Sequence, residues 1–388
     1  MKRFTLTVLS ASLLGIAGVA SSAEIDVMTQ NQYLGADLTP VLGAATADPF
    51  DSVMFSKAVV QALTEIAATR PAARAQALAA EIAQRKPDVV GLQEAYKFGC
   101  SPYPGFPTRR GIGCDDPSIK GAFTDHLRDT VTALRGQYVV AGKVTNLNVA
   151  ALPFYVNSYP AVLTVADRDA ILVRKGLPAA AVDFVALGQC AKPSDQGCNY
   201  QTAPPPFNTP LGPIAIERGF LAVDMKVKGH AYRVFNTHLE QRLLAPSLPE
   251  TRKLQVGQAF ELAGVAAGTW DGQRGLIVVG DFNSAPEDVI DPSVPTPYQV
   301  FMLYGFTDAW TMRPHAEAGL TCCQAEDLTN RKSALYERID MIFPFVRPQR
   351  VLDMRLLGTT MGDKTRPPGN GGLWPSDHAA VAAKLQFE

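Results

Sequence analysis

Short apolar runs that end directly in polar or acidic residues constrain the fold of this chain more than any other feature. Val89–Leu92 is such a run, and Gln93 and Glu94 follow it at once. Leu276–Gly280 is a second, and it leads into Asp281. Runs this short and this apolar are typical of strands buried on both faces. Because open α/β sheets place their sites at the carboxyl ends of strands, we expect these polar side chains to lie together.

The rest of the chain alternates between helical and extended patterns. Residues 56–85 are rich in alanine and read as helical, and Pro71 divides the segment because proline lacks the amide hydrogen that a helix interior needs. A hairpin is expected where 218–227 and 232–239 flank the turn Lys228–His230. This alternation of helices and strands predicts an α/β fold.

Two segments dense in proline, glycine and cysteine, 98–118 and 188–211, are expected to be surface loops. No internal repeat or clear boundary divides the chain, so we expect one domain over 24–388. Further helices are predicted at 119–134, 250–267 and 298–304, and further strands at 25–32, 138–144, 156–165, 169–174, 339–343 and 379–387.

The N-terminus has the pattern of an export signal. Lys2 and Arg3 precede an apolar run over 4–20, and small residues follow it. We expect residues 1–23 to be a signal peptide cleaved after Ala23, which makes the mature chain secreted or periplasmic. A retained membrane anchor is the alternative, although the run is short for a span.

Charge limits the partners of the chain. The formal net charge is −1, so no global basic field collects nucleic acid. A nucleic-acid substrate would need a local basic patch and a metal. Hydrophobic residues make up 47% of the chain, which is enough for a substantial core.

Six cysteines suit an exported, oxidised protein and fall into local pairs. Cys100 with Cys114, and Cys190 with Cys198, would each close a short loop. Cys322 and Cys323 are adjacent, and a bond between neighbours is geometrically strained. That last pair is therefore either a vicinal disulfide, two thiols or part of a longer crosslink. Metal binding by the six cysteines is the alternative to disulfides.

Polar groups recur in order along the chain, and each follows or interrupts a β-like run. Together they supply oxygen ligands for a hard metal, amide and imidazole donors for a phosphate, and an acid that orients a base. That inventory suits metal-assisted hydrolysis of a phosphoester. The groups are Asn31, Gln93-Glu94, Asn236-Thr237-His238, Gly280-Asp281-Phe282-Asn283, Arg338-Ile339-Asp340 and Ser376-Asp377-His378.

This ordered set resembles the endonuclease/exonuclease/phosphatase superfamily of DNase I-like metal-dependent phosphoesterases. The group includes secreted nucleases, base-excision endonucleases, inositol phosphatases and neutral sphingomyelinases. The resemblance runs from Asn31 to His378. It implies a four-layer α/β sandwich, in which two mixed β-sheets pack face to face and helices cover the outer faces.

The resemblance implies a divalent metal ion held by oxygen ligands. Glu94 is similar to the principal metal ligand of the family, and Asp377 is the natural second carboxylate. Asn31 is similar to the first-strand asparagine that helps hold the metal and the phosphate, with a turn-capping role as the alternative. Mg²⁺ is the expected ion, because one or two carboxylates suffice for it, and Mn²⁺ or Ca²⁺ are alternatives.

The acid–base groups are also implied by the resemblance. His378 and Asp340 are similar to the histidine–aspartate pair of the family, in which the carboxylate fixes the imidazole tautomer. Asp281 is similar to the residue that positions or deprotonates water or binds a second metal, and Asn283 to a phosphate donor. Two mechanisms stay open: His378 is the base, or it is protonated and stabilises charge while Asp281 is the base.

Other residues are assigned to the phosphate. His238 is similar to the family histidine that contacts the scissile phosphate and can protonate the leaving group. Asn236 is similar to its companion asparagine, with a turn role as the alternative. Asp169 stands where the family often carries a polar residue near the phosphate.

Several polar residues are not assigned to the centre of the site. His126, His230 and His315 are expected at the surface. Asp308 is expected to be structural, and Arg338 to contact either a phosphate or an acid.

Three functions compete on sequence alone. A secreted nuclease comes first, with phosphate contacts from the arginines 109, 110, 168 and 174. A sphingomyelinase-like phospholipid phosphodiesterase is the alternative, and Leu152–Tyr155 is its candidate membrane wedge. A non-catalytic binding module on the same fold is the third. The expected partner is a phosphodiester substrate, nucleic acid or phospholipid, and we expect a monomer without an obligate protein partner.

Overall fold

The computed structural model of this chain describes residues 23–209, 212–242, 251–289, 293–314, 317–365 and 372–387. The predicted signal peptide lies, apart from Ala23, outside these residues, and so does His315. Among the helices of the described ranges, none is both long and apolar enough to cross a membrane.

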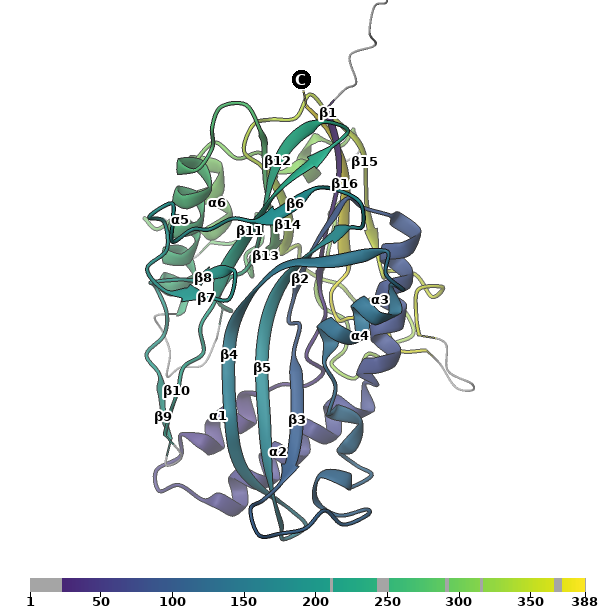
Figure 1. Cartoon of the computed structure of the whole chain (residues 1–388), viewed down its shortest axis with the longest axis vertical. Coiled ribbons are helices and arrows are strands. Elements are labelled where there is room, and N and C mark those ends of the chain that lie inside the picture. Colours follow the sequence, from purple (N-terminus) through teal and green to yellow (C-terminus); the bar gives the residue numbers. More distant parts are fainter. Residues whose placement is uncertain are drawn as a thin grey trace, which may run out of the picture.

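The first sheet has seven strands and carries both chain-terminal strands of the described residues (Figure 1). Only β1 and β2 run parallel, and the other pairs are antiparallel, so the sheet is mixed. Its order is β15 (Arg350–Leu357), β16 (Ala380–Phe387), β1 (Ala23–Asn31), β2 (Val89–Gln93), β5 (Tyr159–Arg174) and β3 (Lys97–Pro102), and β4 (Tyr138–Val156) also pairs with β5.

The second sheet is mixed as well, because β12 and β13 are parallel within an otherwise antiparallel array. Its order is β14 (Asp340–Pro344), β13 (Gly275–Asp281), β12 (His230–His238), β11 (Gly219–Val227), β8 (Gly197–Asn199) and β7 (Pro193–Ser194), and β6 (Ala179–Ala181) also pairs with β11. A separate small ribbon joins β9 (Phe207–Thr209) to β10 (Gly212–Ile214).

The sheets pack face to face because their strands alternate between two apolar sets. On β13, Ile277 and Val279 point into the core between the sheets, whereas Leu276 and Val278 point toward the outer helices. Strand β1 does the same: Val27 joins the central core and Met28 the outer one. Burial on both faces explains why these strands read as continuous apolar runs.

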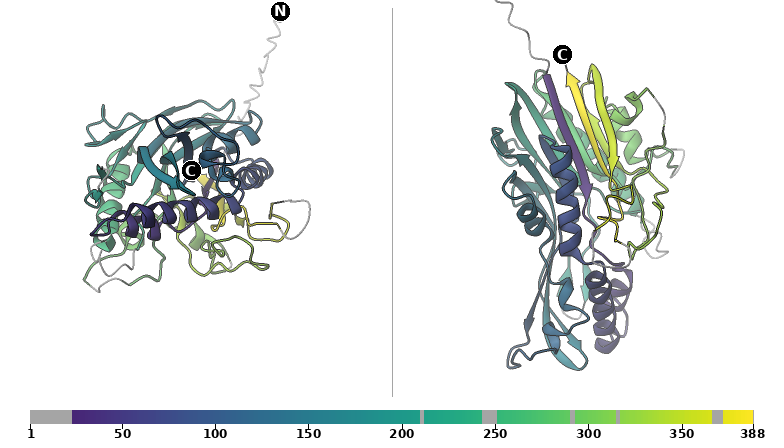
Figure 2. Two further views of the ribbon diagram at one scale, coloured as in Figure 1. Left: turned by 90° about the horizontal axis from the view of Figure 1, so that it is seen from below. Right: turned by 90° about the vertical axis from the view of Figure 1, so that its right-hand side faces the viewer.

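Helices cover both outer faces, which confirms the four-layer α/β sandwich (Figure 2). The first sheet is covered by α3 (Pro71–Arg85) and α4 (His126–Ala133), and the second by α5 (Thr251–Gly268) and α6 (Pro297–Leu303). At the far end of the β4–β5 hairpin lie α1 (Thr39–Ala45) and α2 (Ser52–Ala68). Short 3-10 turns complete the elements: η1 (Gly113–Asp115), η2 (Lys120–Ala122) and η3 (Ala309–Met312).

The two helices α2 and α3 confirm the break at Pro71, and β11 with β12 confirm the predicted hairpin. The prediction of a loop over 98–118 is wrong at its start, because β3 pairs with β5 there. The separate strands predicted at 138–144 and 156–165 belong to one long β4–β5 hairpin with register shifts. Helix 119–134 is shortened to η2 and α4.

Gly91 lies where the two sheets approach each other closely. A Cβ atom placed there would lie 2.5 Å from Oδ1 of Asn236 and 2.8 Å from Cγ2 of Val279. Both neighbours are fully buried, so neither has free space to move into. The glycine therefore sets the spacing between the sheets beneath the polar strand ends.

Gly91→Ala should lower the free energy of unfolding by about 1–3 kcal/mol, because overpacking a filled core forces its neighbours out of position. Gly43→Ala is the control, since no atom lies within 4 Å of the added Cβ and Gly43 is in α1. The control should be neutral or stabilising by up to about 1 kcal/mol. Urea titration measures both, and equal stabilities would contradict this account of the spacing.

Candidate active site

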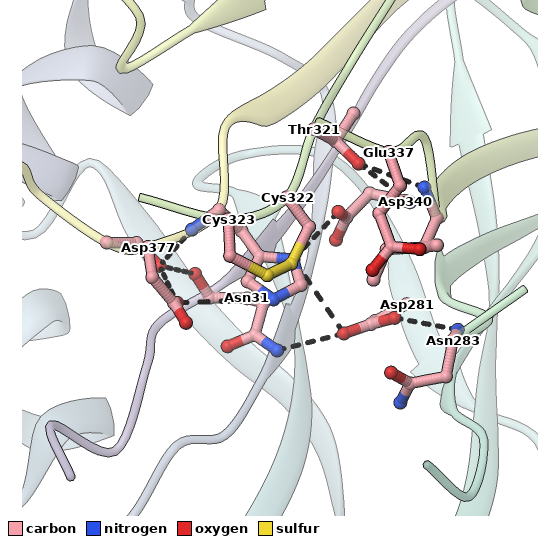
Figure 3. Close-up of a disulfide and its surroundings, with 12 residues drawn as sticks. Asn31, Asp281, Asn283, Thr321, Cys322, Cys323, Glu337, Asp340 and Asp377 are labelled. Atoms are coloured by element: carbon pink, nitrogen blue, oxygen red, sulfur yellow. Dashed lines mark hydrogen bonds and ion pairs between the residues drawn. A yellow bond between two sulfur atoms is a disulfide. The ribbon is translucent and has the colours of Figure 1, made fainter. Parts of the chain in front are cut away.

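Polar residues from both sheets meet at one end of the sandwich. Asn31 ends β1, and Glu94 follows β2 directly. On the second sheet, His238 and Asp281 pair across the ends of β12 and β13, and Asp281 pairs with Asp340 at the start of antiparallel β14. The strand register thus brings these residues together although they are distant in sequence (Figure 3).

Asn31 connects the two sheets through its side chain. Its Nδ2 donates to Oε1 of Glu94 (3.1 Å) and to Oδ2 of Asp281 (3.0 Å). Its Oδ1 accepts from the backbone amide of Tyr33 (2.9 Å), which fixes the orientation of the carboxamide. Asn31 has no solvent exposure. One buried amide therefore sets the separation between a carboxylate of each sheet.

Glu94 is held by the backbone as well as by Asn31. It has a positive φ of 52°, which is uncommon for a residue other than glycine and often marks a functional position. Its Oε2 accepts from the amide of Leu34 (2.8 Å). A carboxylate has about four lone-pair sites, so it can still bind a cation.

Asp377 lies on a short turn that is attached to the end of β1. Ser376 Oγ donates to the carbonyl of Asn31 (2.7 Å), and Arg74 donates to the carbonyls of Gln32 (2.7 Å) and Pro375 (3.3 Å). The Asp377 side chain keeps 16% exposure. These bonds place a partly accessible carboxylate beside the strand that carries Asn31.

The acidic groups around Asp377 suit a divalent cation. Burial raises the pKa of Asp377 to about 7, and the charge of Glu94 adds to this against the opposing effect of His378. A carboxylate whose pKa is raised by burial and by a neighbouring carboxylate lacks a sufficient positive partner, and a bound cation would supply one. The donor set of Glu94, Asp377 and the Asn31 region is also the all-oxygen kind that Mg²⁺ takes.

His378 is paired with Asp340 as the sequence predicted. Its Nδ1 lies 2.8 Å from Oδ2 of Asp340 and 3.8 Å from Oδ2 of Asp281. Burial lowers the pKa of His378, but the charges of Asp340, Asp377 and Asp281 outweigh it and hold that pKa well above its usual value. These carboxylates favour the imidazolium form of the ring, whose Nδ1 donates to Asp340.

His238 has the opposite electrostatic surroundings. Its Nδ1 lies 3.1 Å from Nη1 of Arg218, and a guanidinium can only donate, so Nδ1 is the acceptor and Nε2 carries the proton. Burial and the charge of Arg218 hold the pKa of His238 well below its usual value. Nε2 lies 3.5 Å from Oδ2 of Asp281 and 3.0 Å from the side-chain Nδ2 of Asn283, which cannot accept a hydrogen bond and donates to the carbonyl of Leu239 (3.0 Å).

Asp281 stands between the two histidines. Its Oδ1 accepts from the amide of Asn283 (2.9 Å), and burial followed by the charge of Asp340 raises the pKa of Asp281 to about 6. Ligand atoms of Asp281, Asp340 and His378 lie within 4.8 Å of one another. That cluster is a further place where a cation would fit, besides Glu94 and Asp377.

Two residues assigned to the phosphate have other surroundings. Asn236 lies between the sheets, where its Nδ2 donates to the carbonyls of Leu92 (3.0 Å) and Ala170 (3.1 Å) and its Oδ1 accepts from Gln93 (2.6 Å). Both amide hydrogens are thus in use, which fits an inter-sheet role better than a phosphate contact.

Asp169 is fully buried and accepts from Asn146 (2.9 Å). Burial and then the charge of Asp167 hold the pKa of Asp169 well above its usual value. Because its side chain has no solvent exposure, we propose that it supports the site without touching the phosphate.

The surface assignment of His126 is wrong. His126 is only 4% exposed and packs against Phe98, and burial lowers its pKa to about 3. Arg168 and Arg174, expected to contact phosphate, are paired with Asp125 (2.7 Å) and with Asp88.

Arg338 pairs with Asp308 (2.7 Å), which settles its two alternatives in favour of the acid. Asp308 itself accepts from the amide of Trp310 (2.9 Å) at the start of η3, as expected for a structural residue.

The six cysteines form disulfides in the structure. Cys100 with Cys114 and Cys190 with Cys198 are the expected pairs. Cys322 and Cys323 bond to each other, which is one of the three alternatives for that pair. The two sulfurs lie within 4.8 Å of a ring nitrogen of His378.

Comparison with known proteins identifies the family of the chain. A model of the endonuclease/exonuclease/phosphatase family matches residues 60–378. The chain therefore belongs to this family, whose members are hydrolases acting on phosphoesters. A comparison with curated proteins finds no match.

Solved structures of this family resemble the chain in fold. A mannosyl-6-phosphatase from Bacteroides thetaiotaomicron has 16% identity and a TM-score of 0.51, with 94% of this chain and 100% of that chain covered. Truncated TDP2 from Caenorhabditis elegans has 16% identity and a TM-score of 0.46, with 94% and 98% covered. A family protein from Leptotrichia buccalis has 12% identity and a TM-score of 0.49, with 94% and 100% covered.

Proposed function

We propose that this chain is an exported, Mg²⁺-dependent phosphodiesterase. The observation that carries the proposal is the convergence of carboxylates, amides and two differently protonated histidines around Asn31. Glu94, Asp377 and Asn31 would hold the metal, which supplies Lewis-acid polarisation of a phosphate oxygen. The remaining groups have acid–base and positioning roles.

Asp281 is proposed as the group that orients the attacking water. Its Oδ2 is shared between Asn31 (3.0 Å) and the edge of His238 (3.5 Å), so the carboxylate faces the site centre. His378, held by Asp340, places a positive charge where charge develops on the phosphate. His238, neutral with its proton on Nε2, donates to the phosphate or the leaving oxygen.

A phosphodiester suits the charge of the site better than a phosphomonoester. A monoester carries nearly two negative charges and a diester carries one. The nearby guanidinium groups are already engaged: Arg218 with Asp167 and Glu240, and Arg242 with Asp288 and Glu337. A singly charged diester therefore needs no cation beyond the metal and His378.

A nucleic acid is the first substrate class. The loop over 103–112 exposes Arg109 and Arg110, and Arg109 lies over the ring of Tyr159 (5.7 Å). Tyr103 and Phe106 are 39% and 45% exposed on the same loop. Exposed aromatic and basic side chains together are what bases and phosphates of a single strand bind.

A phospholipid is the second class, and one observation favours it. A cleft of about 830 Å³ opens between β4 and the 193–217 segment beside Asn146, and none of its lining residues is Lys or Arg. Such a cleft does not attract a polyanion. The wedge predicted at Leu152–Tyr155 is not available, however, because Leu152 and Phe154 are buried.

A substrate panel separates these classes. Plasmid DNA, RNA, sphingomyelin and a simple phosphomonoester are compared with and without Mg²⁺. We expect a phosphodiester to be hydrolysed only with the metal, and nucleic acid to be the best substrate.

Glu94→Ala should abolish activity at low Mg²⁺ and recover partly with excess metal. Hydrolysis of the monoester alone would overturn the proposal of a diester substrate. Full activity in the presence of a chelator would overturn the proposed dependence on a metal ion.

His378→Ala should lower the turnover rate by about 10²–10³-fold, because removing one group that stabilises the developing charge costs that much. Asp340→Asn should lower it less, since the imidazole remains and only its orientation and charge are affected. His230→Ala, in the hairpin turn, is the matched control and should keep the wild-type rate. Circular dichroism checks folding. A folded His378→Ala protein with normal turnover would refute the mechanism.

A further inference from the structure

A second set of potential metal ligands lies beside the site, and its chemistry differs from the first. The two sulfurs of Cys322 and Cys323 and a ring nitrogen of His378 lie within 4.8 Å of one another. In the structure the sulfurs are joined as a disulfide, which lies next to Asn31, Asp340 and Asp377 (Figure 3). A disulfide is a poor ligand, whereas its two thiolates are strong ones for soft metals.

The segment that carries the sulfurs is fixed by backbone bonds that do not depend on the disulfide. The amides of Thr321 (2.7 Å) and Cys322 (3.0 Å) donate to the carbonyl of Glu337. On the other side, Gln324 donates to the carbonyl of Asp377 (2.8 Å), and Ala379 donates to that of Thr321 (2.8 Å). Opening the sulfur–sulfur bond therefore leaves both cysteines beside His378.

Thr321 adds a side-chain bond to the same framework. Its Oγ1 accepts from the amides of Ile339 and Asp340, each at 3.1 Å. The cysteine segment and the strand that positions the partner of His378 are thus one hydrogen-bonded unit. The sulfurs and the imidazole keep their relative positions as long as this unit is folded.

One sulfur is reachable from solvent. Cys322 is 2% exposed, but Cys323 is only partly buried. A phosphine reductant can attack it: the phosphorus takes oxygen from water, the sulfur–sulfur bond breaks, and two electrons and two protons convert the sulfurs into thiols. The products are a phosphine oxide and a dithiol, so atoms and electrons balance.

We propose that the reduced pair Cys322 and Cys323, together with His378, forms a zinc site. Two thiolates and one imidazole are ligands of the kind that Zn²⁺ prefers, and three protein ligands leave a fourth position for water. Zinc binding releases the thiol protons. Mg²⁺ does not compete, because it takes oxygen ligands.

Zinc at this site inhibits the enzyme, a consequence that rests on the proposed function. A zinc ion bound to the ring occupies the imidazole that the proposed mechanism directs at the phosphate, so His378 can no longer contact the substrate. The oxidised chain keeps the sulfurs bonded to each other and leaves His378 with Asp340. Zinc sensitivity therefore depends on the redox state of a single cysteine pair.

Zinc binding is measured directly, without using activity. The full chain is treated with a phosphine, freed of it under anaerobic conditions, and titrated with Zn²⁺ against a chromophoric chelator. We expect the reduced chain to bind one zinc ion more than the oxidised chain, and to bind that ion more tightly than the oxygen and imidazole ligands of the oxidised chain bind zinc. Co²⁺ in place of zinc should give the charge-transfer absorption of a cobalt–thiolate bond. Equal zinc binding by both forms would overturn the proposal.

Variants locate the ligands. Cys322→Ser with Cys323→Ser should lose zinc binding, and Cys190→Ser with Cys198→Ser is the matched control that should keep it. His378→Ala keeps both thiols and should bind zinc at least about tenfold more weakly, since even groups that only orient a ligand are worth 10–100-fold. This variant tests the site even where the cysteine variant does not fold. Undiminished binding in His378→Ala would overturn the imidazole ligand.

The activity arm is read separately. The reduced chain should lose activity when zinc is added and regain it when a chelator removes the zinc. A chain that binds zinc without losing activity would contradict inhibition. A chain with no phosphoesterase activity in any form, yet with redox-dependent zinc binding, would refute the proposed function and leave the zinc site in place.

Discussion

The site depends on one buried carboxamide. Asn31 donates to Glu94 of the first sheet and to Asp281 of the second, and its position is fixed because β1 pairs in parallel with β2. Two carboxylates that share one hydrogen-bond donor, as Glu94 and Asp281 do, repel each other unless a donor or a cation lies between them. Asn31 supplies the donor, and the proposed metal would supply the cation. The same residue therefore holds the two sheets together at this end and sets the spacing of the charges in the site.

Electrostatics then divides two histidines between two roles. His378 is surrounded by Asp340, Asp377 and Asp281, and its pKa is raised, whereas burial and Arg218 lower the pKa of His238. One ring thus holds a positive charge and the other a neutral N–H, within one site. Titratable groups whose environments separate their pKa values are a recurring sign of acid–base catalysis. Through the proposed zinc site, the vicinal cysteines make the availability of His378 depend on their redox state.

Sequence patterns predicted what depends on local chemistry. The short apolar runs before Glu94 and Asp281 predicted two buried strands with acids at their carboxyl ends, and Pro71 predicted the break between two helices. Arg218 was missed as a site residue because nothing in its neighbourhood indicates that it faces His238 across the sheet. The family resemblance assigns Asn236 to a phosphate, whereas its inter-sheet bonds to Leu92 and Gln93 join residues far apart in sequence and leave no local pattern. Such roles depend on side-chain contacts between residues that are distant in sequence, and the local pattern of a single sequence does not predict those contacts.

The central claim is that Glu94 and Asp377 hold the metal while Asp281, Asp340 and His378 remain free for chemistry. Mn²⁺ takes the oxygen ligands that Mg²⁺ takes and scatters anomalously, so a crystal soaked with it locates the ion. The account predicts an anomalous peak at bonding distance from carboxylate oxygens of Glu94 and Asp377. A peak bonded to Asp281, Asp340 and His378 alone, with none at Glu94, would contradict it.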